Sequence, residues 1–142
     1  MKAALIILAS VCLPAANSSP EPPAKDHEPI GAVLARVPPK ARAKRNPLEN
    51  DAQALLGGRK LFDQHCAECH GESGDGTRRA PGLRGALLDQ ASDGEIFWIM
   101  TNGVLRHGMP AWGKLPEPQR WQIVAFLRSM KVPASEPTEN PR

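Results

Sequence analysis

The pentapeptide Cys66-Ala67-Glu68-Cys69-His70 has the pattern C-x-x-C-H and decides how the rest of the 142-residue chain is interpreted. Two thiols three positions apart share one turn of a helix, so each can add to one vinyl group of a haem. The histidine that follows is then placed beneath the ring, where an imidazole nitrogen can bind iron. This spacing is typical of covalent haem attachment. It predicts that Cys66 and Cys69 hold the cofactor and that His70 is the first axial ligand.

Three other uses of a C-x-x-C pair compete with haem attachment. A redox pair of the thioredoxin kind needs a βαβ context, and the sequence shows none. A zinc site needs two more cysteines or histidines at matching spacing. The other histidines, His27, His65 and His107, are scattered along the chain. A disulfide between Cys66 and Cys69 would close a short, strained loop. Covalent haem attachment is therefore the favoured interpretation.

Residues 48–132 are the part of the chain expected to fold, and the first helix predicted there spans about 51–65, with Asn50 as its N-cap. Residues at helical spacing mark one face of this helix: Leu55, Gly58 and Phe62. The helix leads directly into the C-x-x-C-H motif, so we expect the motif to begin where this helix ends.

Two further helices are predicted after the motif. One begins with a capping box formed by Ser92 and Glu95, and it ends near Gly103. The other runs from about 118 to 131 and stops before Pro133. No alternating strand pattern is present, so the predicted class is all-α. The intervening loops, 71–91 and 103–117, are long for so small a domain and need something other than protein to hold them.

A six-coordinate haem iron needs a second axial ligand, and four downstream side chains are candidates. Met109 is favoured because it lies in a loop, 106–112, where a glycine and a proline flank it and no helical face has to be filled. Met100 and Met130 fall within apolar helical stripes, where methionine usually fills gaps. His107 is the remaining alternative, although an exposed position at the haem rim or on the surface suits it better.

The N-terminal segment, residues 1–19, has the layout of a secretory signal peptide. A lysine precedes an apolar run of about 11 residues, which would span only about 16 Å as a helix, short of a hydrocarbon core of about 30 Å. Small residues follow for cleavage. Cys12 lies inside the run; removal with the signal is favoured over lipid attachment, because the bulky Val11 precedes it.

The segments on either side of the predicted domain are rich in proline. Residues 20–47 are expected to form an extended, disordered linker, with little periodicity outside 30–37. A local positive run lies in it: Lys40, Arg42, Lys44 and Arg45. Residues 133–142 are expected to be a disordered tail. The positive run is interpreted as a solvated tether, with docking to an acidic partner or anionic lipid as the alternative.

The charge distribution argues against a nucleic-acid partner. The whole chain carries a formal net charge of +3, but residues 48–132 contain ten basic and ten acidic residues. Binding to phosphates needs a surplus of clustered cations.

The chain length is too short for two ordinary domains and sufficient for a single small one.

With these motifs in place, the sequence resembles the bacterial class I, mono-haem cytochromes c over about 48–131. Three blocks carry the resemblance: Gly58, Phe62, the C-x-x-C-H motif and the following Gly71, Gly74, Gly76, Pro81 and Leu83; Asp93-Gly94-Glu95-Ile96-Phe97-Trp98; and Gly108-Met109-Pro110-Ala111-Trp112. The resemblance implies a small fold in which three main helices wrap around one covalently attached haem c.

The resemblance also implies several roles around the cofactor. The first and last helices cross closely, with Gly58 allowing Phe126 to approach. The carbonyl of Pro81 accepts the second ring N–H of His70, which fixes the tautomer. Met109 completes the iron coordination. Contacts to the haem propionates vary within the family, and the candidates are Arg84, Trp98, Asn102 and Trp112.

The function implied by the resemblance is electron transfer, without enzymatic activity of its own. A His/Met-ligated haem cycling between Fe(II) and Fe(III) would act in the periplasm, between a dehydrogenase or quinol-oxidising complex and a terminal oxidase or reductase. Redox proteins are the expected partners of a monomer, with peripheral membrane association left open. One alternative is a haem subunit fixed in an oxidoreductase complex, for which the linker would be a tether or contact. A gas-binding haem sensor is the other, and it would need a labile sixth site.

Overall fold

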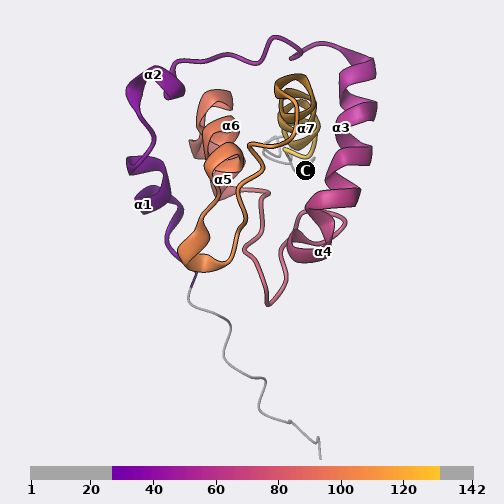
Figure 1. The fold of residues 1–142 in the computed structure, drawn as a ribbon. Helices are drawn as coiled ribbons and strands as arrows, with labels where there is room; N and C mark the ends of the chain where they lie inside the picture. Colours follow the sequence, from indigo (N-terminus) through magenta and orange to yellow (C-terminus); the bar gives the residue numbers. More distant parts are fainter. Residues whose placement is uncertain (1–26, 132–142) are drawn as a thin grey trace, which may run out of the picture.

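The computed structural model describes residues 27–131, which form helices and loops with no β-strand among them. In chain order the elements are α1 (Ile30–Ala35), α2 (Pro39–Arg42), α3 (Ala52–His65), α4 (Ala67–His70), α5 (Ala86–Gln90), α6 (Asp93–Asn102), the short 3₁₀-helix η1 (Leu105–His107) and α7 (Glu117–Ser129). This arrangement confirms the all-α prediction (Figure 1). The predicted signal peptide, 1–19, and tail, 133–142, lie outside the described residues.

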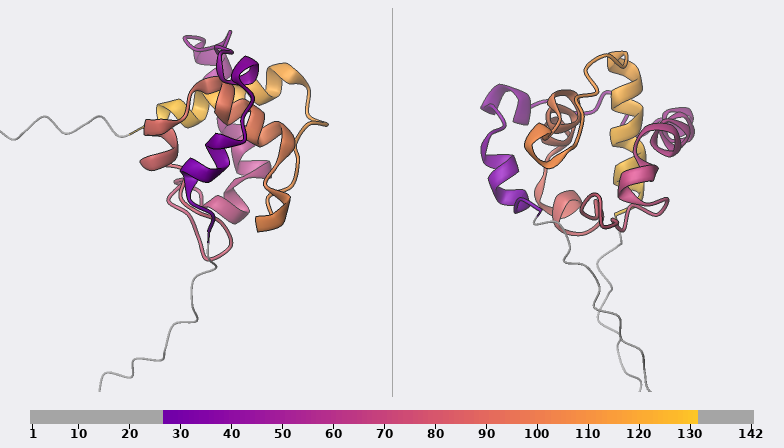
Figure 2. Two further views of the ribbon diagram at one scale, coloured as in Figure 1. Left: turned by 90° about the vertical axis from the view of Figure 1, so that its left-hand side faces the viewer. Right: turned by 60° about the horizontal axis from the view of Figure 1, so that its bottom comes forward.

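The most extensive helix contact is the crossing of α3 and α7, which lie side by side in Figures 1 and 2. Gly58 makes this crossing possible. A Cβ atom at Gly58 would overlap the carbonyl oxygen of Gln122 and would lie 2.9 Å from Cβ of Phe126. The rings of Phe62 and Phe126 pack beside it with centroids 5.3 Å apart. The predicted close approach of Phe126 to Gly58 is therefore present.

Replacing Gly58 by alanine is expected to destabilise the fold by about 2–3 kcal/mol, since the added methyl group collides with backbone rather than with a flexible side chain. Gly57→Ala is the matched control, because its Cβ would meet only the side-chain end of Gln122, at 3.1 Å. Denaturant unfolding of the haem-loaded protein measures both. Equal costs for the two variants would contradict the role given to Gly58.

A second layer is formed by α5 and α6, which pack on α7. Phe97 of α6 stacks on Trp121 of α7 with ring centroids 4.0 Å apart. The guanidinium of Arg128 joins the two layers by donating to Asp93 Oδ1 at 2.6 Å and to the carbonyl oxygens of Leu88 and Ala91 at 2.6 and 2.5 Å. These contacts fix the start of α6 against the end of α7.

Local signals placed the helix starts well, with small differences. The capping box is present: Ser92 N–H donates to Glu95 Oε2 at 2.7 Å, and Glu95 N–H donates to Ser92 Oγ at 3.3 Å. The N-cap of α3 is Asp51 rather than the predicted Asn50, because the Asp51 carboxylate accepts from two backbone N–H groups of the first turn. Helix α7 ends at Ser129, two residues before the predicted end.

The prediction of an extended linker over 20–47 is wrong for the part that the structure describes. Residues 27–46, here called the N-terminal strap, contain α1 and α2 and pack along the outer side of α6 (Figures 1 and 2). Val33 and Val37 are buried, 7% and 3% exposed. The prolines start helices here rather than prevent them: Pro29 precedes α1, and Pro39 is the first residue of α2.

The strap is fixed to the rest of the fold by tertiary contacts. At Gly94 a Cβ atom would overlap the carbonyl oxygen of Ala41, so α6 approaches the strap as closely as only glycine allows. Ser92 Oγ donates to the carbonyl oxygen of Arg42 at 2.9 Å. The buried Asn46 donates from Nδ2 to the carbonyl oxygen of Trp121 at 3.0 Å. The strap is therefore part of the folded unit.

Candidate haem site

The C-x-x-C-H motif forms a tight junction between α3 and α4. Cys66 ends α3, and its N–H donates to the carbonyl oxygen of Phe62 at 2.8 Å. The next turn is α4, in which the N–H of His70 donates to the carbonyl oxygen of Cys66 at 2.9 Å. This turn buries the His70 side chain, which is 8% exposed. Both Cys66 and Cys69 are free thiols.

An apolar cavity lies between the helices, and His70 and Met109 both line it. Cys66 also lines the cavity, whereas Cys69 is exposed and is not among the lining residues. The other lining side chains are apolar: Phe62, Leu83, Leu87, Ile96, Ile99, Met100, Trp112, Ile123 and Leu127. The fold thus brings together the first predicted axial ligand and the favoured second one, which are far apart in the sequence.

The His70 ring is held by the loop that follows α4. Its Nδ1 lies 2.9 Å from the carbonyl oxygen of Pro81. Since a carbonyl oxygen only accepts, Nδ1 carries the proton and Nε2 keeps the lone pair that a metal needs. The loop is closed by a bond from the N–H of Gly76 to the carbonyl oxygen of His70, at 2.8 Å. The geometry implied for Pro81 by the family resemblance is present.

Burial sets the protonation states of the motif. It lowers the pKa of His70, while the bond to the Pro81 carbonyl opposes this shift and the charge of His27 adds to it. Burial likewise raises the pKa of the Cys66 thiol to about 12, with a further increase from Cys69. The motif therefore presents a neutral imidazole, the form that binds metals, and a protonated Cys66 thiol at neutral pH.

Met109 reaches the cavity from the loop after α6. Val104 and Met109 form an isolated antiparallel bridge, with N–H to oxygen distances of 3.0 and 3.2 Å, and η1 closes the loop between them. The N–H of Trp112 donates to the carbonyl oxygen of Met100 at 3.0 Å, which returns the chain to α6. Met109 is therefore held in a small closed loop rather than on a helix.

The other three candidates for the second axial ligand lie in different places. Met100 also lines the cavity, but from α6 within the main core, 4% exposed. Met130 lines a separate, open groove beside α3 and α7. His107 does not line the cavity, and its Nε2 lies 3.6 Å from Glu28 Oε2. Of the four candidates for the second axial ligand, two line the cavity, Met100 and Met109.

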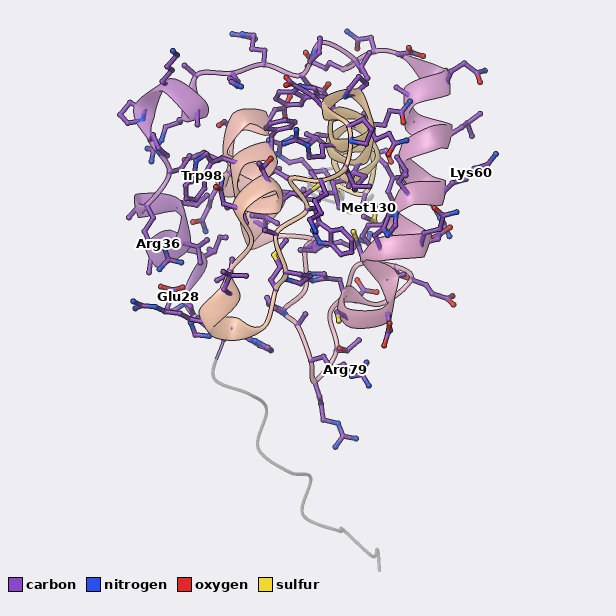
Figure 3. The ribbon with its side chains drawn as sticks, in the orientation of Figure 1. Glu28, Arg36, Lys60, Arg79, Trp98 and Met130 are labelled. Carbon is purple, nitrogen blue, oxygen red and sulfur yellow. The ribbon has the colours of Figure 1, made fainter. Side chains whose placement is uncertain are left out.

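Of the four residues predicted as candidates for contacts to the haem propionates, one lines the cavity. Trp112 lines the cavity, and its indole packs against His65 with ring centroids 5.0 Å apart. Arg84, Trp98 and Asn102 are not among the lining residues. Trp98 packs instead against the strap (Figure 3). The sequence motifs already include part of the apolar wall, such as Phe62, Leu83 and Ile96. Leu87 and Ile99 belong to none of these motifs and are recognisable only once the helices are packed.

The donor set and the walls fit a haem better than a simple metal ion. One imidazole, the thioethers of Met100 and Met109, the Cys66 thiol and apolar side chains surround the cavity, a donor set that suits a porphyrin ring with two axial ligands. Among residues 27–131 no group of three or more His, Cys, Asp or Glu side chains is arranged to hold a metal ion. A zinc site of the usual Cys and His composition is therefore absent from the described part of the chain.

Comparisons with known proteins agree with this site. Residues 53–127 match the family described as cytochrome c oxidase, cbb3-type, subunit III. The cytochrome bc1 complex cytochrome c subunit of Corynebacterium diphtheriae is 30% identical over 88 residues, 61% of this chain and 31% of that protein. The subunit of the same name from Corynebacterium efficiens is 33% identical over 76 residues, 52% of this chain and 25% of that protein. The chain thus spans between a quarter and a third of these curated relatives.

A solved structure shows the same fold. Cytochrome CL from the marine methylotrophic bacterium Methylophaga aminisulfidivorans superposes with a TM-score of 0.55 and 24% sequence identity, covering 75% of this chain and 70% of that one. Members of the matched family carry covalent haem c and act as electron carriers or as subunits of complexes. With the matched region spanning more than half of the sequence and containing the C-x-x-C-H motif, the chain belongs to this family of c-type cytochrome domains.

Proposed function

We propose that this chain transfers electrons through one haem c, attached to Cys66 and Cys69 and bound axially by His70 and Met109. The observation that carries the proposal is that His70 and Met109 line one apolar cavity. When bound, the haem supplies one-electron chemistry by cycling between Fe(II) and Fe(III). His70 and Met109 would hold the iron from its two sides, so that neither oxygen nor a substrate would reach the metal without displacing Met109.

The chain's residues tune this site in three ways. The Pro81 carbonyl holds the His70 ring in one orientation and makes its free nitrogen a better donor. A methionine thioether is a soft, neutral ligand that favours the reduced state, so the potential should be higher than with two histidines. Apolar side chains such as Ile123 and Leu127 exclude water, which lowers the reorganisation that accompanies electron transfer.

The proposed cellular setting is the periplasm, between a dehydrogenase or quinol-oxidising complex and a terminal oxidase or reductase. Residues 1–19 support export, as a predicted signal peptide. Among residues 27–131 no helix has the length and apolar character needed to cross a membrane. The proposal is a monomer with redox-protein partners, and peripheral membrane association through Cys12 is the less favoured option.

A second candidate function is that of a haem subunit fixed within an oxidoreductase complex. The names of the two relatives favour it, since both are cytochrome c subunits of a bc1 complex. Purification of the membrane fraction at high salt distinguishes the two proposals. A free carrier is released by salt, because exposed ion pairs are screened, whereas a fixed subunit stays with a membrane enzyme.

Carbon monoxide binding tests the ligation that both proposals share. The purified, reduced wild-type protein is expected to be low-spin. Its absorbance in the main haem band should change by less than about a tenth on exposure to carbon monoxide, because this ligand must first displace Met109. Optical titration measures this. A wild-type protein that binds carbon monoxide readily would contradict the ligation and favour the sensor alternative.

A further inference from the structure

We propose that the N-terminal strap positions the axial-ligand loop, with Val33 and Glu28 as the positioning residues that keep Met109 on the iron. The inference rests on the proposed ligation by Met109 and deepens it by assigning a purpose to a segment outside the matched family region of 53–127. Two sets of contacts carry it, one apolar and one polar, and both join the strap to the loop between α6 and Met109.

The apolar contacts form a small second core. Val33 and Val37 of the strap are buried together with Ile99 of α6. Val104 and Met109, the two ends of the closed loop, both pack against this cluster. Ile99 and Met109 also line the haem cavity. Met109 is therefore in contact with two cores, the cavity on one side and the strap cluster on the other.

A polar contact reaches the middle of the same loop from Glu28 of the strap. Glu28 accepts two hydrogen bonds from the guanidinium of Arg36, at 2.6 and 2.8 Å. The Glu28 side chain is 19% exposed, and its Oε2 also lies 3.6 Å from Nε2 of His107 in η1. Figure 3 shows Glu28 and Arg36 together beside the loop that follows α6. Arg36 thus orients a carboxylate of the strap toward the loop that carries Met109.

The strap can act as a support because its other end is anchored. The contact of α2 with Gly94 and the bond from Asn46 to the Trp121 carbonyl fix it to α6 and α7. Between 104 and 109 the loop's own bonds are the Val104–Met109 bridge and the turn of η1, both of which are local, and the Trp112 bond to the Met100 carbonyl ties its far end to α6. On the outer side the strap adds contacts that are distant in sequence, and these help to set where the loop lies.

The consequence is an equilibrium between a seated loop and an open one. A ligand that needs the open loop binds with an apparent affinity reduced by the fraction of open protein. Weakening the strap contacts raises that fraction and so strengthens binding of an added ligand to the iron. Couplings of this kind typically change affinity by about 5- to 150-fold. Imidazole is a suitable probe because it competes directly with the thioether.

The test uses the full-length, haem-loaded ferric protein. Val33→Ala is expected to tighten imidazole binding about five- to tenfold. Val124→Ala is the matched control, since Val124 is fully buried in α7 but is not among the residues that line the cavity or form the strap cluster. The control should lose at least as much stability while changing imidazole affinity by less than about twofold.

A surface pair of variants keeps the test independent of folding. Glu28→Gln should tighten imidazole binding about two- to threefold, because it weakens the charge-assisted bonds from Arg36 that orient this side chain toward η1, without disturbing the core. Asp63→Asn is its control, since Asp63 pairs with Arg59 on α3, away from the loop. The charge-transfer absorption band of methionine-ligated ferric haem is recorded for every variant.

The outcomes separate this inference from the proposed function. If the wild type lacks the methionine band, the proposed ligation by Met109 is wrong, and the inference about the strap is contradicted as well. If the wild type has the band but Val33→Ala and Glu28→Gln bind imidazole as the wild type does, the strap does not position the loop. Equal shifts in Val33→Ala and Val124→Ala would also overturn it, since the effect would then follow general stability.

Discussion

Replacing Cys66 and Cys69 together by alanine is expected to abolish haem that survives denaturation, and each single replacement should remove most of it. The reason is that thioether bonds to these two sulfurs are the covalent link of the proposed site. Haem stain on a denaturing gel measures the loss. The haem would also fill the apolar cavity, whose walls belong largely to the main core, so the free energy of unfolding should fall by about 4 kcal/mol without it.

A control lies within the same motif. Glu68→Ala changes one of the two intervening positions, where the carboxylate is exposed and pairs with Arg79 at 2.7 Å. An exposed pair of this kind contributes little to stability, so this variant should keep its haem. Haem that remains on the chain through denaturation in the double cysteine variant would contradict the assignment of Cys66 and Cys69.

The replacement of Met109 by alanine is expected to convert the ferric protein from low-spin to high-spin and to open the iron to added ligands. The potential should fall by on the order of 0.1 V, because the reduced state loses a soft neutral ligand. Optical spectra, carbon monoxide binding and a redox titration follow the three effects.

Met100→Leu is the matched variant for this experiment, because Met100 lines the same cavity from α6. Leucine conserves the volume of methionine, so the change should cost less than about 1.5 kcal/mol and leave the spectrum low-spin. If Met100→Leu gives the high-spin spectrum while Met109→Ala does not, the second axial ligand is Met100.

The features that the sequence predicted correctly rest on short-range patterns. A capping box joins residues three apart, Ser92 and Glu95, and both bonds are present. The C-x-x-C-H motif encodes its function within five residues. The N-cap of α3, Asp51, was missed by one position because Asn50 has a similar capping propensity.

The strap was mispredicted because its signals are weak locally and strong only in the folded state. Helices of six and four residues are too short for a convincing periodic pattern. Their stability comes from partners distant in sequence, such as the packing of α2 on Gly94. Proline counts favoured a linker, although prolines at the first position of a helix are compatible with helical structure.

In the candidate site, too, the local sequence predicted some features and only tertiary packing shows the others. A loop position distinguished Met109 from the helical methionines, but only tertiary packing shows that Met100 shares its cavity and that Met130 does not. In the same way, no pattern separates Trp112, which lines the cavity, from Trp98, which packs against the strap. Motifs indicate chemistry, whereas the walls of the site depend on how the helices pack.

Intact-mass spectrometry of the wild-type protein, purified from the periplasm and denatured, tests the central claim most directly. The account predicts a single species heavier than the processed polypeptide by the mass of one haem. The same spectrum reports the cleavage point of the predicted signal peptide and any lipid on Cys12. A mass equal to that of the polypeptide alone would contradict the account.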